Sequence, residues 1–372
     1  MRVGFDARWY NHSGVGAYVS GLLPGLAAVS RDIDLVVYAD PGNPVPGLDR
    51  LPLTVIPVHA AKYSLGEQIE LSRRARADKL DIFHSPFFAV PIGTSCPIVV
   101  TVHDLIPFLF RIYPWPKQAM IKMAYRMAAL RARHVIADSE NTARDVQCIL
   151  GVPIERITAI HLAPGESFNH TQGHGDLESL EEKYAVRPPY VVLASARNWR
   201  TKNLETGLEA VSRAHHTTGA AFQTVVYGPP DGINVLHAED RWSNLNLRQT
   251  GYIPAGDLAM LFRHARAFLM PSLYEGFGLP IVEAMACGCP VITSNGGSLQ
   301  EIAGDGAQVF APFDAQGMAA GIAGLIKNQE NFEHWRAAAL RRAADFTWEQ
   351  AAQQTISIYH RIHDQFSSAG GA

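Results

Sequence analysis

The stretch Tyr274–Ile292, "YEGFGLPIVEAMACGCPVI", holds two carboxylates around a glycine loop and a short helical pattern. Pro280 suits the first turn of a helix and Gly288 suits the stop after its last turn, so the sequence predicts a helix over Pro280–Cys287. Backbone N–H groups at such a loop and helix start can bind an anion or a row of hydroxyls. The stretch therefore predicts a binding site for an anion or a polyol.

The two carboxylates of this stretch predict different tasks. Glu283 lies in the first helical turns, where we expect the helix dipole to keep it ionised. An ionised carboxylate only accepts hydrogen bonds, which suits a vicinal diol such as a ribose. Glu275 lies on the strand end before the loop, from where it can reach a second polyol. The spacing alone fits equally well a helix whose first-turn glutamate only caps it.

Outward from this stretch, short apolar runs alternate with helical patterns along the whole chain. The runs "MRVGFDA", "DLVVYA" and "PIVVTVHD" read as strands, and the pattern restarts at "YVVLASA". Such alternation implies parallel sheets covered by helices on both faces. The polar, glycine-rich stretch Pro164–Asp176 interrupts it, and we interpret this stretch as the junction between two Rossmann-like domains. Ligands bind at the carboxyl ends of strands in such sheets, so we expect a cleft between the domains.

The composition excludes several classes of protein. With 372 residues, 47% hydrophobic and 18% charged, the chain is a folded protein, and its net charge of −3 gives no global attraction to nucleic acid. The longest uncharged stretch, Ile82–His103, contains three prolines and reads as two buried strands rather than a membrane span. No signal peptide is visible and the four cysteines fit small buried residues in a reducing compartment, so we expect a cytoplasmic protein.

The pattern E-x7-E inside "SLYEGFGLPIVEAMACGCPVI" resembles the signature of the large retaining glycosyltransferase family four, also called group 1, which adopts the GT-B fold. The resemblance covers nearly the whole chain. It implies that Glu283 holds the donor nucleotide's ribose and that Glu275 faces the donor sugar and is important for catalysis. The loop residues implied to bind donor sugar and phosphate are Gly276, Phe277, Gly278 and Leu279.

The family fold implies an α/β protein with two Rossmann-like domains facing each other across a cleft. Residues 1–170 would form the acceptor-binding domain and residues 171–187 a linker. Residues 188–347 would form the nucleotide-sugar-binding domain. Residues 348–372 would form a C-terminal helix that packs back toward the N-terminal domain.

A departing nucleoside diphosphate develops negative charge that needs cations or a metal. In "ASARNWRTKNLETGLEAV", Arg197 and Lys202 follow a strand, and their fork and point charge suit a diphosphate, although a basic loop is often only solvated. The resemblance implies that this pair binds the pyrophosphate, with Ala196 in place of the family's usual glycine. The D-x-D at residues 32–34 has no phosphate loop beside it, so we expect no metal and no other cofactor.

The N-terminal half adds candidate residues. His103 ends the strand "PIVVTVHD", where a core histidine is the blander interpretation, and the resemblance implies that it lies beside the donor sugar. Asp104 would orient its ring or bind acceptor. Gly14 and Gly16 in "SGVGAY" resemble the family's glycine loop near the donor phosphate or the acceptor. In the C-terminal half, Tyr252 and Ile253 are implied to border the nucleotide base.

Residues 105–137 contain six Lys or Arg residues and no acid. Lys122, Arg126 and Arg133 are expected near one helical face, with methionines on another. This suits an anionic membrane surface or a lipid-diphosphate acceptor, so we expect peripheral contact with the inner face of the cell membrane; a solvated helix face is the alternative.

The leading functional hypothesis is a retaining, metal-independent hexosyltransferase. The opening "FDARWYNHSGVGAYVSGLL" and "VTVHDLIP" look most like bacterial mannosyltransferases of surface polysaccharide synthesis. This favours GDP-mannose over a UDP-sugar as donor, and a saccharide or lipid-linked saccharide as acceptor. A nucleotide-sugar epimerase or phosphorylase, and a non-catalytic nucleotide-sugar binder, are the alternatives.

Overall fold

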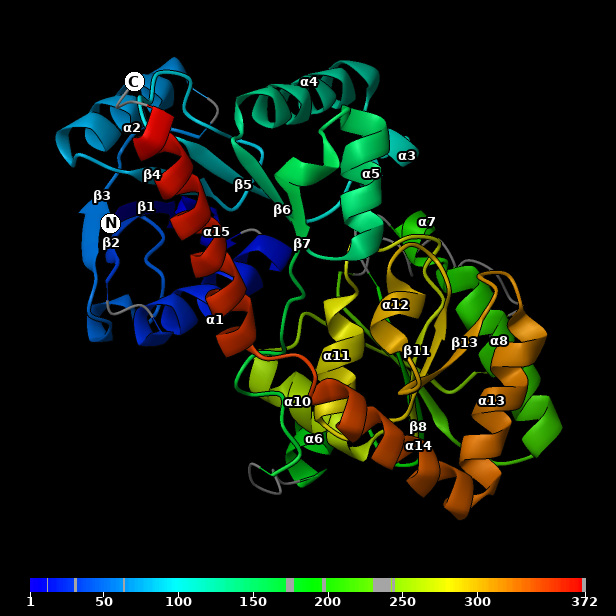
Figure 1. Ribbon diagram of the computed structural model, residues 1–372. Coiled ribbons are helices and arrows are strands. Elements are labelled where there is room, and N and C mark those ends of the chain that lie inside the picture. Colours follow the sequence, from blue (N-terminus) through cyan, green and yellow to red (C-terminus); the bar gives the residue numbers. More distant parts are fainter. Residues whose placement is uncertain are drawn as a thin grey trace. The chain divides into compact units, whose positions relative to one another are not determined.

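The computed structural model describes residues 1–372 except 12, 30–31, 63, 172–176, 196–198, 230–241, 243–244 and 370–372. It divides into two compact units (Figure 1). Unit 1 comprises Met1–Ala163 and Thr347–Ala372, and unit 2 comprises Pro164–Phe346. Each unit is built around one parallel sheet.

The sheet of unit 1 has seven strands in the order β3-β2-β1-β4-β5-β6-β7, and each strand pairs in parallel with its neighbours. The strands are β1 Arg2–Asp6, β2 Asp34–Ala39, β3 Thr54–Pro57, β4 Ile82–Ser85, β5 Ile98–Val102, β6 His134–Ala137 and β7 Ile157–Ala159. The helices are α1 Ser13–Val29, α2 Leu65–Ala77, α3 Ile106–Leu109, α4 Trp115–Arg131, α5 Glu140–Leu150 and α15 Trp348–Ala369, and the short 3-10 helix η1 is Ala7–Asn11. Strands β4, β5 and β6 are buried at every position, which explains why most of their residues are apolar.

The last helix, α15, belongs to unit 1 and packs along α1 (Figure 1). Two glycines of α1 make the close approach possible. A Cβ at Gly21 would lie 1.9 Å from the Trp348 ring, and one at Gly25 would lie 2.8 Å from the Trp348 carbonyl oxygen. Farther along α15, the Tyr359 hydroxyl lies 2.5 Å from Nδ1 of His84 on β4. Small residues and one buried polar contact therefore fix α15 on unit 1.

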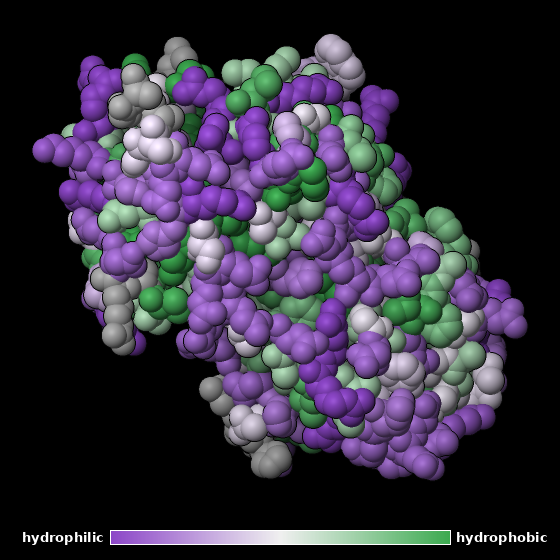
Figure 2. Space-filling view, in the orientation of Figure 1, coloured by the Kyte–Doolittle hydropathy of each residue, from purple (hydrophilic) through white to green (hydrophobic). Residues whose placement is uncertain are grey.

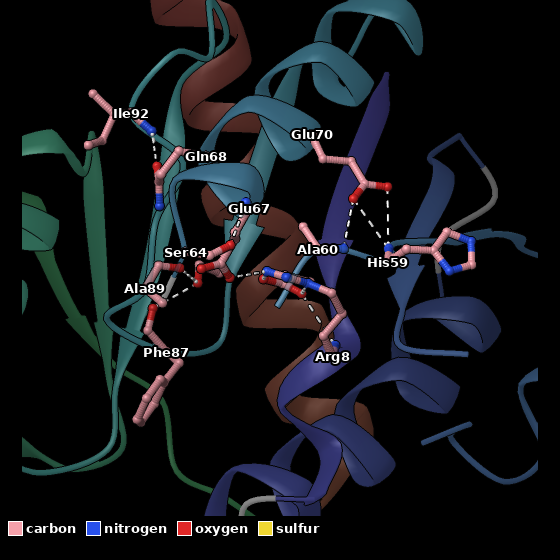
Figure 3. Close-up of polar contacts among 12 residues, drawn as sticks. Arg8, His59, Ala60, Ser64, Glu67, Gln68, Glu70, Phe87, Ala89 and Ile92 are labelled. Atoms are coloured by element: carbon pink, nitrogen blue, oxygen red, sulfur yellow. Dashed lines mark hydrogen bonds and ion pairs between the residues drawn. The ribbon is translucent and has the colours of Figure 1, made fainter. Parts of the chain in front are cut away.

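A buried ion cluster holds the segment after β1. The Arg8 guanidinium donates to both carboxylate oxygens of Asp6, at 2.8 and 2.7 Å, and to Glu67 at 2.7 Å. Figure 3 shows Arg8 pointing at Glu67 in the first turn of α2, where Ser64 also accepts the Glu67 N–H. All three charged side chains are almost fully buried, so removing one would leave an uncompensated charge. The cluster joins the end of β1 to the start of α2.

The sheet of unit 2 has six strands in the order β10-β9-β8-β11-β12-β13, also parallel. The strands are β8 Tyr190–Ala194, β9 Gln223–Tyr227, β10 Leu247–Gly251, β11 Ala267–Met270, β12 Val291–Ser294 and β13 Ala307–Phe310. The helices are α6 Leu177–Tyr184, α7 Trp199–Lys202, α8 Leu204–Thr218, α10 Ala255–His264, α11 Leu279–Ala286, α12 Leu299–Ala303, α13 Ala315–Lys327 and α14 Gln329–Ala343.

Alternate residues of the unit 2 strands enter two separate cores, one on each face of the sheet. Val192 and Phe268 pack with Phe262 of α10 and residues of α11. The neighbouring residues Val191 and Leu269 pack with helices α8 and α13. Helices therefore cover both faces, as the alternating sequence pattern predicts. In such sheets, ligands bind at the carboxyl ends of the strands and in the loops that follow them.

Candidate functional site

The loop between β11 and α11 is held in one conformation by its glycines and by a buried aromatic ring. Gly278 is the N-cap of α11 with φ +90°, and a Cβ there would lie 2.6 Å from Leu299. The Phe277 ring is buried edge-to-face against Phe346, with centroids 5.9 Å apart. Its side chain therefore faces the core, and the loop can offer a ligand only its backbone. The N–H groups at the start of α11 lie at this end of the sheet.

Glu275 has a fixed backbone. It pairs as an isolated parallel bridge with Gly297, and its carbonyl oxygen accepts bonds from the backbone N–H and the hydroxyl of Ser298, both 3.1 Å long. Gly297 has φ +65°, and a Cβ on it would lie 2.3 Å from the Glu275 carbonyl oxygen. Local sequence patterns do not predict this contact, although the pair Gly296-Gly297 after the strand "PVITS" indicates a close backbone approach there.

The structure brings Lys202 and Glu275 together. Lys202 Nζ donates to Glu275 Oε1 at 2.7 Å, and the two side chains are 19% and 12% exposed. Arg197, the other predicted diphosphate ligand, lies outside the described residues. Arg200 is exposed on α7. One cation of the predicted pair is thus placed beside the predicted catalytic carboxylate.

Asn203, which was not among the residues predicted from the sequence, positions Lys202. Its backbone has φ +52°, a conformation that asparagine tolerates better than most residues. Its side-chain amide donates to the carbonyl oxygens of Pro271 and Pro312, at 3.0 and 2.6 Å. The Leu273 N–H donates to the Thr201 carbonyl oxygen at 2.7 Å. The segment that carries Lys202 is therefore tied to the loop that carries Glu275.

The expectation that the helix dipole keeps Glu283 ionised is wrong. Burial raises the pKa of its carboxyl group to about 8, although part of the side chain stays open to solvent. It is the fifth residue of α11, where the effect of the helix dipole, confined to the first turn, no longer keeps it ionised. Among the described residues, its carboxyl group has no hydrogen bond or ion pair. Glu283 is thus a half-buried acid with its hydrogen-bonding capacity unused by the described protein.

Tyr227, at the end of β9, lies near both acids. Burial raises the pKa of its hydroxyl well above the usual range, and the nearby charges of Glu283 and Glu275 raise it further. The carboxyl groups of Glu275 and Glu283, which flank the loop, therefore both lie close to Tyr227. Sequence spacing alone does not predict Tyr227, because β9 is remote from the loop along the chain.

The two residues expected beside the base have different environments. Tyr252 is 85% exposed just after β10, so its ring is open for stacking. Ile253 is 4% exposed and belongs to the core of unit 2. Only the backbone of Ile253 is therefore available to a ligand.

In unit 1, His103 follows β5, and its partner is Asp138 rather than Asp104. His103 Nδ1 lies 2.7 Å from Asp138 Oδ2, and Nε2 lies 2.9 Å from the Pro86 carbonyl oxygen. Asp104 instead accepts the backbone N–H of Ile106 at 2.8 Å. Asp138 lies 35 residues from His103 in sequence, and the pairing of β5 with β6 brings the two together.

Gly14 and Gly16 lie in the first turn of α1 and not in a loop, which corrects the expected glycine loop. A Cβ at Gly16 would lie 2.0 Å from the Tyr10 carbonyl oxygen, so close packing against Tyr10 requires glycine at this position. A Cβ at Gly14 would meet nothing within 4 Å.

Two family models match the chain. The model for glycosyl transferases group 1 matches residues 178–342, and the model for Glycosyltransferase Family 4 matches residues 12–163. The chain belongs to the group 1, family 4 glycosyltransferases. This confirms the family that the E-x7-E pattern indicates, and with it a retaining glycosyltransferase that uses a nucleotide-sugar donor.

Curated relatives and solved structures agree with this assignment. O-antigen chain mannosyltransferase B of Escherichia coli is 29% identical over 75% of this chain and 74% of that protein. Serotype-specific mannosyltransferase WbdA of Escherichia coli is 30% identical over 73% of this chain, which spans 34% of that protein. Anabaena HepE, solved in complex with UDP-glucose, is 18% identical with a TM-score of 0.74, covering 99% of this chain and 100% of that one. The last comparison shows the GT-B fold, which confirms the predicted fold class.

The D-x-D of this glycosyltransferase lies at the amino end of β2, away from the strand ends that bind ligands. Asp34 pairs with Arg2 at 3.2 Å, and Asp32 lies 3.3 Å from His360. In the part of the chain that the structure describes, no group of three or more His, Cys, Asp and Glu side chains could hold a metal ion.

Proposed function

We propose that this glycosyltransferase moves a mannosyl group from GDP-mannose to a saccharide or lipid-linked saccharide acceptor. The observation that carries the proposal is the Lys202–Glu275 contact beside the amide loop of α11. The likeness to O-antigen chain mannosyltransferase B supports mannose as the sugar. HepE binds UDP-glucose in its crystal structure, which makes a UDP-sugar the alternative donor.

Unit 2 binds the donor in this proposal. The ribose diol donates to Glu283, which then ionises and releases a proton, because a diol stabilises the charged carboxylate. Tyr252 stacks on the base, and the N–H groups of Gly278 and Leu279 hold the phosphate and sugar oxygens. Lys202 turns from Glu275 to the β-phosphate, with Arg197 as the second cation, which leaves Glu275 for the sugar hydroxyls.

The transfer step follows from these positions. The bond from the anomeric carbon to the phosphate oxygen breaks, and the electron pair stays on the diphosphate, which Lys202 neutralises. The acceptor oxygen bonds to the anomeric carbon on the same face, and its proton passes to the departing phosphate oxygen. No carboxylate is proposed as a nucleophile, so the product keeps the donor's anomeric configuration without a covalent intermediate. The resemblance of the sequence to the family adds His103 as a residue at the donor sugar.

A donor screen in excess EDTA tests this proposal. Purified protein is incubated with a mannosyl-lipid acceptor and, in separate reactions, GDP-mannose, UDP-glucose, UDP-galactose or UDP-N-acetylglucosamine. We expect transfer from GDP-mannose that chelation does not abolish. Faster transfer from a UDP-sugar contradicts the donor assignment. Conversion of the donor alone into a new nucleotide sugar supports the epimerase alternative.

We also propose that α4 contacts an anionic membrane surface. Its outer side carries an apolar stripe of Met120, Met123, Met127 and Leu130, with exposed fractions of 58%, 57%, 40% and 77%. At about 100° per residue, Lys117 and Arg131 fall on one side of this stripe and Arg126 on the other. Figure 2 shows green side chains along the outer edge of α4 among purple ones. An apolar stripe flanked by cations suits the boundary of an anionic leaflet.

The structure corrects part of the expected basic face. Helix α4 ends at Arg131, so Arg133 lies outside it, and its guanidinium donates to Gln365 of α15 at 3.3 Å. Lys122 Nζ and the Arg126 guanidinium carbon lie 5.4 and 5.3 Å from the centre of the Phe108 ring, so both cations pack over α3. Lys122 is half-buried there, whereas Arg126 stays exposed beside the apolar stripe. In the part of the chain that the structure describes, no helix is long and apolar enough to cross a bilayer. We propose a peripheral contact through the apolar stripe and its flanking cations, at the inner face of the cell membrane.

A further inference from the structure

The hydrogen-bond partners of His103 restrict its protonation. Nε2 lies 2.9 Å from the Pro86 carbonyl oxygen, which can only accept, so Nε2 carries a hydrogen. In a neutral ring, Nδ1 would then present its lone pair to the Asp138 carboxylate at 2.7 Å. Two acceptors cannot bond without a proton between them. The pair therefore holds one more proton than a neutral histidine and an ionised aspartate would.

The surroundings place this proton on the ring. Burial by itself lowers the pKa of His103. The charge and hydrogen bond of Asp138, the hydrogen bond to Pro86 and the charge of Asp104 all raise it, and together they outweigh burial, so the pKa of His103 is raised. His84, packed nearby on β4, has its pKa lowered to about 3 by burial, so it adds no competing positive charge. The Tyr18 ring of α1 meets the His103 ring edge-to-face at 5.1 Å and brings no charge.

The His103 side chain is enclosed on its nitrogen sides and open only in part. It is 15% exposed, whereas Asp138 is 3% exposed. Both N–H groups point at protein acceptors, so a ligand can meet only a carbon edge or a face of the ring. A ring held in this way cannot accept a proton from an acceptor hydroxyl without first breaking one of its two bonds.

We propose that His103 is a fixed imidazolium, that Asp138 is its positioning residue, and that His103 presents charge to the sugar without exchanging a proton. The role at the sugar rests on the proposed function, whereas the protonation state and the part of Asp138 do not. The assignment agrees with a transfer step in which the acceptor proton leaves on the phosphate oxygen. It also distinguishes the two acids near the ring: Asp138 bonds to it, and Asp104 acts only through space.

Nitrogen-15 NMR of the imidazole rings in the free protein tests the protonation state directly. His103→Gln assigns the signals by their loss. We expect both His103 nitrogens to stay protonated well above the ordinary histidine pKa of about 6.5. Asp138→Asn should lower the titration by about one to three pH units, the usual effect of a close opposite charge. Asp104→Asn is the matched control and should shift it less. Titration of wild-type His103 near its ordinary pKa would overturn the proposal whatever the donor is.

The pH dependence of turnover separates positioning from simple structural support. Wild-type kcat/KM should show no inflection from His103, whereas Asp138→Asn should lose activity as pH rises through the lowered His103 pKa. Asp138→Glu should restore part of the wild-type profile. If Asp138→Asn lowers kcat/KM by one constant factor at all pH values, with His103 still doubly protonated, Asp138 only supports the fold. A failed donor assignment changes the substrate used in this assay but leaves the NMR result intact.

Discussion

Lys202 Nζ lies 2.7 Å from Glu275 Oε1, and the two residues follow neighbouring strands of one sheet, β8 and β11. In a nucleotide sugar, the phosphate and the anomeric carbon share one oxygen. A cation for the phosphate and an acid for the sugar must therefore lie next to each other. The contact satisfies this requirement, and Asn203 and Gly297 hold the two backbones in place.

Replacing Lys202 separates its phosphate role from the rest of the site. Lys202→Gln should weaken binding of a free nucleoside diphosphate by about tenfold to a hundredfold, because a hydrogen bond to a charged group contributes about 1.5–3 kcal/mol. Binding of the nucleoside without phosphates should be nearly unchanged. Calorimetry with both ligands measures the difference. Equal weakening for both would show that Lys202 supports the fold of the site rather than the diphosphate.

Glu283 predicts a pH-dependent stability. Its pKa is about 8 in the folded protein against 4.5 for the free group, so the folded state holds the proton more tightly. Its contribution to the free energy of unfolding is therefore greatest at low pH and falls as pH rises between these two values. Glu283→Gln removes this dependence, so its melting temperature relative to wild type should rise with pH. Thermal unfolding at about pH 5 and about pH 8.5 checks this.

Glu182→Gln, at an exposed position of α6, is the control for that comparison. Its melting temperature should follow the wild-type pH dependence. Parallel curves for Glu283→Gln and wild type would contradict the account of Glu283 as an acid kept neutral by burial.

The close packing of α15 on α1 predicts that one added methyl group at Gly21 destabilises the fold. Gly21→Ala places a Cβ about 2 Å from the Trp348 ring, so either the ring or α15 must move. We expect a loss of about 1–3 kcal/mol in the free energy of unfolding and faster proteolysis near the C-terminus. Gly14→Ala is the matched control in the same helix, because its Cβ meets nothing within 4 Å. If both variants unfold alike, Trp348 does not fix α15 on α1.

The cations that flank the apolar stripe of α4, Lys117, Arg126 and Arg131, predict membrane binding that weakens as salt rises. Each cation near an anionic leaflet contributes about 1 kcal/mol at low salt. Lys117→Ser, Arg126→Ser and Arg131→Ser together should therefore weaken binding to phosphatidylglycerol vesicles by about two decades, since about 1.4 kcal/mol is tenfold. Vesicle sedimentation at low and high salt measures this.

Exposed cations elsewhere in unit 1 provide the control for charge alone. The control chain carries Arg73→Ser, Arg76→Ser and Lys79→Asn, which lie on α2 or just after it. It should bind vesicles like wild type. Equal losses in the two triple variants, or no binding by wild type at low salt, would mean that the α4 stripe is only a solvated surface.

The sequence predicts the strands and the two-unit arrangement of helices and sheets because buried parallel strands need continuous apolar runs. It also places Glu275, Lys202 and His103 at the ends of strands, where ligands bind. What it cannot supply is the order of strands within a sheet. Asp138 meets His103 only because β6 lies beside β5, and Tyr227 reaches both acids only because of how unit 2 folds.

Two errors have a related physical cause. The charge expected for Glu283 follows from its place in a helix, but burial by the rest of unit 2 outweighs the helix dipole. The basic face expected around Arg133 assumes that the helix continues, but α4 ends at Arg131. Asn203 differs from both, since its left-handed backbone leaves only a weak signal in sequence. Local patterns predict elements better than they predict the surroundings of a side chain.

Comparing Glu275→Gln with Glu283→Gln, in nucleotide binding and in turnover, tests the central claim that the two acids have separate tasks. Glu275→Gln should lower kcat by about a hundredfold or more while binding the free nucleoside diphosphate at least as tightly as wild type, because Lys202 loses its competing partner. Glu283→Gln offers the ribose diol one acceptor oxygen in place of two, so it should weaken nucleoside diphosphate binding by about tenfold or more. Equal weakening of nucleotide binding in both variants, with equal losses of turnover, would contradict the account.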